Sequence, residues 1–406
     1  MLQKTWLIEN VLPYLYVLTV RRLAGCCAHI RQCVVDDENR LLAVEARIAG
    51  DRALGHGVIR FVSPGILQSV HVEELGTNIS HSDFQHVFAL LKKSTLQELR
   101  IIIRNAHLLG DITIQGLAAV LPERLQRLVL YFGDVPENHE PSSAISNYGL
   151  KVLTAALPKG LQLLTLCFRA CRLTSLKTLV EVLPTLTNLT DLTLDFCENQ
   201  DLCLDSLSLG PAMTGLRNMT DLSIDFSYIA VDPDELQLLI IGLPDSLECV
   251  AFDLGGTTCF HDNGHAISEV LSSLPASVRN LCLALNQMVE SFSTMPDQHV
   301  VRAVMSSLPT QIESFSLDIG LNDEQEWDAE DIVYAISDML QRKSSLTHLD
   351  LNMEALSKIS DDHIETISNL LRSRDVSFEL CTVGCSTARS RYSYQMSYSY
   401  DTLQIE

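Results

Sequence analysis

The chain has 406 residues, of which 47% are hydrophobic and 20% are charged. This balance excludes a disordered chain and a collagen-like fibre, because enough apolar side chains are present to bury a core. Lysine and arginine number 29 against 51 aspartates and glutamates, which gives a net charge of −22. A protein that binds nucleic acid needs clustered positive charge, so nucleic acid is not an expected partner.

The charge is unevenly distributed along the chain. Residues 1–60 carry eight basic and six acidic side chains, so nearly all of the negative charge lies after them. A near-neutral head followed by an acidic body predicts two parts with different partners.

No segment has the properties of a membrane span or a secretory signal. The apolar residues 11–20 contain Pro13 and run into Arg21 and Arg22, and no small-residue cleavage site follows. A span needs about 20 apolar residues. The 12 cysteines show neither a paired framework nor zinc-ribbon spacing, which predicts reduced thiols in the cytoplasm or nucleus and no bound metal. No membrane partner is expected.

The head contains a short pattern of apolar residues and cysteine within residues 11–31. Its spacing resembles the F-box, a helical hairpin that packs against the adaptor subunit of a cullin ubiquitin ligase. No Leu-Pro opens the motif, Tyr16 replaces a frequent aspartate, and residues 36–60 would form a connecting helix and linker. The resemblance implies that the adaptor contacts Val11, Leu12, Leu15, Val20, Leu23, Cys27 and Ile30.

After the head, the pattern L-x-x-L-x-L, with other aliphatic residues allowed, recurs at intervals of 28 to 36 residues. Alternation with period two places the leucines of L-x-L on one face of a short strand. The ten copies begin at Leu67, Leu96, Leu125, Leu161, Leu189, Met219, Leu247, Val278, Ile312 and Leu346.

Each interval also carries the signals of one helix. In the clearest copy, Asp232, Pro233 and Glu235 form a capping box, an apolar run of helical period follows, and Leu243-Pro244 ends the helix. Proline cannot continue a helical hydrogen-bond ladder. The same Leu-Pro pair recurs at residues 121, 157, 183, 274 and 308, and a turn or cap is expected at Asp111, Asp205, Asp262, Asp297 and Asp361.

This alternation resembles the leucine-rich repeat family over residues 61–380, and its long interval is similar to the ribonuclease-inhibitor-like class. The resemblance implies an α/β solenoid, a horseshoe with a parallel inner sheet and outer helices. That family places Asn or Cys three residues after the last strand leucine, whereas here only Cys197 and Asn286 fit. We therefore expect the backbone of the turns to be satisfied by other groups.

The domain organisation follows from these patterns. We predict an F-box-like segment or cap with a linker over residues 1–60, a solenoid over 61–385, and a disordered Ser/Tyr-rich tail over 386–406. Residues 133–141 are polar and proline-broken and predict a projecting loop. Two interpretations of the head stay open, because residues 5–50 would equally suit an amphipathic cap over the first repeat.

The repeat register predicts which side chains face the concave surface. Aspartates fall on neighbouring strands about 5 Å apart, and arginines precede them. One hypothesis is a docking groove for a Lys/Arg-rich segment of a protein partner; the other is that exposed strand positions are simply polar. The residues concerned are Asp191, Asp195, Asp221, Asp225, Asp253, Arg100 and Arg127. We expect lysine at Asp195, Asp225 and Asp253 to abolish such binding with little effect on unfolding.

No catalytic pattern is found. The sequence has no phosphate-binding loop, and residues 259–265 are typical of a turn that precedes a helix. We predict a non-enzymatic protein-interaction module without cofactor or metal, acting as an F-box-type substrate receptor of a ubiquitin ligase. The alternative is a leucine-rich repeat scaffold with no link to a ligase.

Overall fold

The computed structural model describes residues 43–48, 69–74, 81–92, 96–103, 106, 108–133, 143–202, 209–231, 233–257, 264–285, 298–319, 329–352, 361–374 and 376–381. Strand and helix alternate once per repeat, so the predicted fold class, an α/β solenoid of leucine-rich repeat type, is confirmed. The chain divides into two compact units, Met1–Cys249 and Val250–Glu406.

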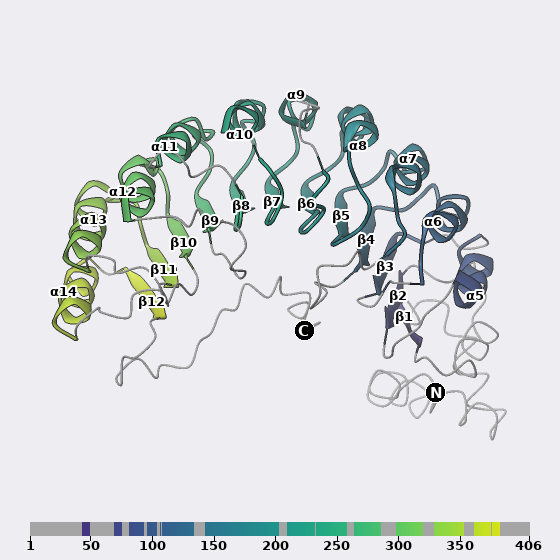
Figure 1. Ribbon diagram of the computed structural model, residues 1–406, viewed down its shortest axis with the longest axis horizontal. Helices are drawn as coiled ribbons and strands as arrows, with labels where there is room; N and C mark the ends of the chain where they lie inside the picture. The colour runs from purple at the N-terminus through teal and green to yellow at the C-terminus, as the bar shows by residue number, and fades with distance from the viewer. Residues whose placement is uncertain are drawn as a thin grey trace, which may run out of the picture. The chain divides into compact units, whose positions relative to one another are not determined.

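The first unit contains seven complete strands, each from β2 onward followed by a helix in the described part of the chain (Figure 1). The strands are β1 (Ala43–Ile48), β2 (Ser69–Glu74), β3 (Glu98–Ile103), β4 (Arg127–Phe132), β5 (Leu163–Phe168), β6 (Asp191–Asp195) and β7 (Asp221–Asp225). The helices are α5 (His81–Leu91), α6 (Asp111–Ala118), α7 (Asn147–Ala155), α8 (Lys177–Val182), α9 (Leu209–Met213) and α10 (Pro233–Ile241), with a 3-10 turn, η2, at Leu183–Thr185.

The strands of the first unit pair in parallel and in chain order, from β1 to β7. Where the structure describes it, the first residue of each motif in this unit packs into the core, and Leu96, Leu125, Leu161 and Leu189 are fully buried. The two strand leucines that follow it face the helices and are also buried. The alternate side chains therefore lie on the opposite face of the sheet, which we call the inner face.

A second apolar column, which the sequence analysis did not identify, follows the strands. Phe132, Phe168, Phe196 and Phe226 are buried at equivalent positions, and the rings of Phe132 and Phe168 stack at a centroid distance of 5.7 Å. The column fills the core at the end of the strands in consecutive repeats.

Most of the predicted Leu-Pro stops act just after a helix. The α7 helix ends at Ala155 before Leu157-Pro158, and α10 ends at Ile241 before Leu243-Pro244. The proline carbonyl then accepts a hydrogen bond from the first leucine of the next motif, as from Leu161 N to Pro158 O at 3.3 Å. One pair differs, since Leu183-Pro184 lies inside the 3-10 turn.

The second unit repeats the same alternation. After β8 (Cys249–Asp253), whose first residue ends the first unit, come β9 (Asn280–Ala284), β10 (Ser314–Asp318), β11 (His348–Asn352) and β12 (Ser377–Cys381). Strands β9 to β12 pair in parallel in chain order. The helices are α11 (His265–Ser272), α12 (Gln298–Ser307), α13 (Ala329–Arg342) and α14 (Asp361–Arg372).

Two expectations need correction. Residues 43–48 form strand β1 rather than a helix or linker, because Val44, Ala46 and Ile48 alternate with charged residues and pair with β2. Asp111 does not cap its own helix: it is the first residue of α6, whose N-cap is Gly110.

Several predictions fall outside the described residues. They concern the F-box-like segment, the loop after Gly133, the caps at Asp205, Asp232, Asp262 and Asp297, and the tail over 386–406. They stay predictions, as does the proposed domain division. Within the described residues, no helix combines the length and apolar composition that a membrane span requires.

Candidate functional site

The inner face of the first unit carries three rows of side chains that run across β3 to β7. The strand register sets them. Row one is Glu98, Arg127, Leu163, Asp191 and Asp221; row two is Arg100, Val129, Thr165, Thr193 and Ser223; row three is Ile102, Tyr131, Cys167, Asp195 and Asp225. Asp191 thus lies opposite Asp221, and Asp195 opposite Asp225.

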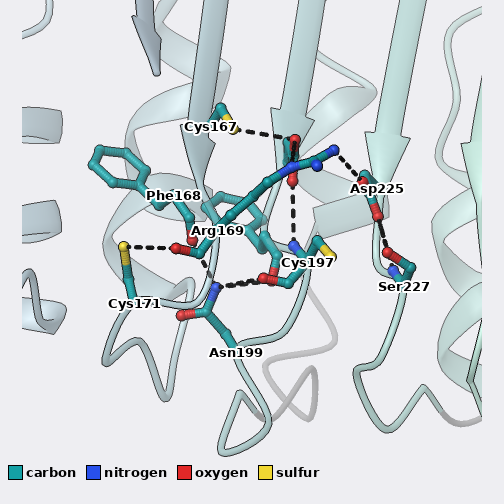
Figure 2. A network of polar contacts seen from close by, with 10 residues as sticks. Cys167, Phe168, Arg169, Cys171, Cys197, Asn199, Asp225 and Ser227 are labelled. Atoms are coloured by element: carbon teal, nitrogen blue, oxygen red, sulfur yellow. Dashed lines mark hydrogen bonds and ion pairs between the residues drawn. The ribbon is translucent and has the colours of Figure 1, made fainter. Parts of the chain in front are cut away.

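Row three contains a buried ion-pair cluster that the sequence analysis did not foresee. Arg169 follows β5, and its guanidinium group lies between the carboxylates of Asp195 and Asp225 (Figure 2). Its Nε donates to Asp195 Oδ2 at 2.6 Å and its Nη2 to Asp225 Oδ2 at 3.0 Å. The side chains of Asp195, Asp225 and Arg169 are 0%, 2% and 17% exposed. One arginine therefore joins three consecutive repeats.

The remaining carboxylate oxygens of the cluster bind the turns that follow the strands. Asp195 Oδ1 accepts from Cys197 N at 3.3 Å, and Asp225 Oδ1 accepts from Ser227 N at 2.9 Å. In the second unit, Asp253 Oδ1 accepts from Gly255 N at 3.0 Å in the same way. A strand-terminal aspartate thus supplies the acceptor for a turn N–H group, which accounts for the scarcity of the Asn or Cys that the family pattern places there.

A buried asparagine completes the turn after β6. Asn199 Nδ2 donates to Phe168 O at 2.7 Å and to Phe196 O at 2.8 Å, and its Oδ1 accepts from Leu173 N at 3.2 Å (Figure 2). It therefore ties the turn of one repeat to the preceding repeat. The sequence analysis missed it because it lies five residues, not three, after Leu194.

The buried thiols beside the cluster are unsuited to nucleophilic chemistry. Burial, followed by the charge of Asp195, raises the pKa of Cys167 well above its usual value, and its Sγ donates to Asp195 Oδ2 at 3.1 Å. Burial likewise raises the pKa of Cys171 to about 12. Because a thiolate is the reactive form, these thiols are inert at neutral pH.

The pairing of Arg169 separates the predicted acidic residues into two classes. Asp195 and Asp225 are buried and already paired, so their carboxylates are not presented to a partner. Lysine at either position would bury a cation beside Arg169 and remove an acceptor from a turn, so we now expect it to destabilise the protein, contrary to the expectation from the sequence. Asp253 is half-buried in the second unit.

The acidic residues of row one differ from those of row three in burial and in pairing. Asp191 and Asp221 are half-buried, and each accepts one hydrogen bond from the preceding threonine: Thr190 Oγ1 to Asp191 Oδ2 at 2.5 Å and Thr220 Oγ1 to Asp221 Oδ2 at 2.7 Å. Within the described part of the chain, neither carboxylate forms an ion pair. Among the residues that the structure describes, the two negative charges therefore lie opposite each other without a cation.

Basic side chains lie on the same face, two and three strands away. Arg127 shares row one with the acidic pair, and Arg100 lies in row two on β3. Both are half-buried. Leu163, also half-buried, stands in row one between Arg127 and Asp191. After Glu98, row one thus presents a positive position, an apolar position and two negative positions in strand order.

The other predicted contact residues cannot be placed. Val11, Leu12, Leu15, Val20, Leu23, Cys27 and Ile30 lie outside the described residues. Among the residues that the structure does describe, no group of three or more His, Cys, Asp or Glu side chains is arranged to hold a metal ion.

No protein-family model and no curated protein matches the chain. Among solved structures it is similar to the leucine-rich repeat-containing protein LegL7 from Legionella pneumophila, with 13% identity, a TM-score of 0.42, and coverage of 82% of this chain and 98% of that one. It is also similar to the complex of Rad7 and Elc1 in yeast, with 15% identity, a TM-score of 0.40, and coverage of 80% and 90%. At these values neither likeness bears on what this chain binds.

Proposed function

We propose that the chain is a protein-interaction module that binds a basic segment of another protein on the inner face of its first unit. The observation that supports this is the contrast between two pairs of aspartates. The buried pair, Asp195 and Asp225, has Arg169 as its counter-ion, whereas the half-buried pair, Asp191 and Asp221, has no cation among the described residues.

The half-buried pair favours a cationic ligand on electrostatic grounds. Two like charges directly opposite each other on neighbouring strands repel. A lysine or arginine from a partner would relieve that repulsion and form charge-assisted hydrogen bonds, which are stronger than neutral ones. The net charge of −22 would also raise the rate of encounter with a basic partner.

A more specific proposal is that the bound protein is presented to a ubiquitin ligase. The apolar pattern of the head supports an F-box-type receptor, in which Leu15 and Leu23 contact a ligase adaptor and the repeats select the target. The second candidate is a scaffold without a ligase link, in which the head only covers the end of the repeats.

A charge-reversal experiment tests the binding face. A labelled lysine-rich peptide is titrated against the wild type, against Asp191→Lys with Asp221→Lys, and against Glu181→Lys with Asp245→Lys. The control residues are exposed and lie in α8 and after Pro244, outside the inner-face rows. Both variants change the net charge equally, so any loss of long-range electrostatic attraction to the peptide is the same in both.

We expect the row-one variant to bind the peptide at least about tenfold more weakly than the wild type, and the control variant to bind it with nearly the wild-type affinity. Equal affinity of the two variants would mean that only the net charge attracts the peptide, and the assigned face would be wrong. Circular dichroism of each variant verifies that the repeats remain folded.

A further inference from the structure

We infer that the segment bound on row one is an α-helix that lies across the strands and presents an acidic, an apolar and two basic residues on one face. This inference rests on the proposed function and adds the conformation and residue spacing of the partner. It rests on the order of Arg127, Leu163, Asp191 and Asp221, the four positions that follow Glu98 along row one.

The chemistry of row one defines the order of groups on the partner. Arg127 calls for a carboxylate, Leu163 for an apolar side chain, and Asp191 and Asp221 for two cations. All four are half-buried, so each has accessible surface for such a contact. Neither Asp191 nor Asp221 has an ion-pair partner among the described residues.

The spacing of row one decides between a helix and an extended segment. Neighbouring strands lie about 4.8 Å apart, so the four positions fall at roughly 0, 5, 10 and 14 Å along the row. Same-side residues of an extended chain recur every ~6.6 Å, and drift out of step after one strand. One helical turn advances ~5.4 Å, close enough to the strand spacing for long side chains to remain opposite each position.

A helix of the correct pattern can be written from this match. An acidic residue at i, an apolar residue at i+4 and lysines at i+7 and i+11 lie on one face and rise by about 0, 6, 10.5 and 16.5 Å. Placing the acid first and the lysines last also suits the helix dipole. The partner class is therefore an amphipathic helix with separated charges rather than an unstructured polybasic tail.

Three peptides of about 20 residues on an alanine-glutamine background test the inference against the full chain. The first has Glu, Leu, Lys and Lys at i, i+4, i+7 and i+11. The second has the same composition with strand spacing, at i, i+2, i+4 and i+6. The third is the first peptide with proline at i+6, away from the contact face, where it breaks the helix.

Calorimetric titration should give an affinity for the first peptide at least tenfold above those for the other two. Arg127→Glu should weaken the first peptide, and replacing its Glu by Lys should restore the affinity, which would place the acidic residue opposite Arg127. Similar affinities for all three peptides would overturn the helix while leaving the proposed acidic binding face intact. If none of them binds, and the lysine-rich peptide of the charge-reversal experiment does, the inference fails alone; if neither kind binds, the proposed function fails with it.

Discussion

At the scale of single residues, the same side chain has two roles that depend only on its row. Asp195 and Asp225 end their strands, accept hydrogen bonds from the following turns and share Arg169. Asp191 and Asp221 begin theirs, are half-buried and bind only a threonine hydroxyl among the described side chains. The first pair stabilises the fold, and the second is the pair that we propose as the ligand site.

Removing the shared cation gives a prediction about stability. Arg169→Met should lower the free energy of unfolding by about 3–5 kcal/mol, because it leaves two buried carboxylates without a counter-ion. Urea denaturation followed by circular dichroism measures the change.

Arg127→Met is the matched control. Arg127 is half-buried on the inner face and forms no ion pair within the described residues, so its loss should cost less than about 0.5 kcal/mol. If both variants unfold at the same urea concentration, the pairing of Arg169 with the buried carboxylates does not stabilise the fold.

At the scale of elements, the backbones of α9 and α10 approach each other closely. The α9 helix is a single short turn, and its Gly210 lies against the backbone of α10. A methyl group added to Gly210 would collide with the carbonyl oxygen of Leu238, and one added to Gly242 would collide with the backbone of Gly210. Glycine is required at both positions by close approach of backbone atoms, which cannot move aside as a flexible side chain can.

This contact predicts that a glycine-to-alanine substitution within a helix destabilises the protein instead of stabilising it. Alanine is favoured over glycine within a helix by about 1 kcal/mol, yet Gly210→Ala should destabilise the protein, by roughly 1–3 kcal/mol, because the added methyl group overpacks the contact. Thermal unfolding of the two proteins measures the difference.

Gly160→Ala provides the comparison for that measurement. The nearest atom to its added methyl group would be Leu125 O at 3.8 Å, an ordinary contact, so this variant should unfold close to the wild type. A Gly210→Ala protein as stable as Gly160→Ala would show that α9 can shift without cost.

At the scale of the whole molecule, charge and repetition set how the chain meets its partners. The acidic charge lies almost entirely after residue 60, and the head is nearly neutral. A basic target would therefore be drawn to the repeats, whereas contact of the head with an adaptor would depend on apolar side chains.

Co-purification with the cullin-ligase adaptor subunit tests the ligase link. The full-length protein should retain the adaptor, and a Leu15→Asp, Leu23→Asp variant should lose it, because a carboxylate cannot be buried in an apolar helix contact without a large desolvation cost.

The lysine-rich peptide serves as the control for folding, since the variant should still bind it through the first unit. Adaptor retained equally by both proteins, or by neither, would reject the F-box-type receptor and favour the scaffold without a ligase link.

Local patterns in the sequence were sufficient to predict the architecture. Period-two leucines specified the strands, Leu-Pro pairs stopped several helices, and a repeat of 28 to 36 residues required parallel stacking. These are local signals, carried by residues close together in the chain, and each repeat confirms its neighbour. The register that brings Asp191 opposite Asp221 follows from the same spacing.

Which carboxylates are paired within the protein and which remain accessible depends on how the repeats pack. Arg169 was recognisable as a basic residue after its strand, but its partners lie 26 and 56 residues later. Whether a guanidinium points to solvent or across two repeats depends on side-chain direction and burial, which no spacing rule specifies. For this reason the sequence could place four aspartates on one face, while stacking of the repeats determined that Asp195 and Asp225 are buried and that Asp191 and Asp221 stay accessible.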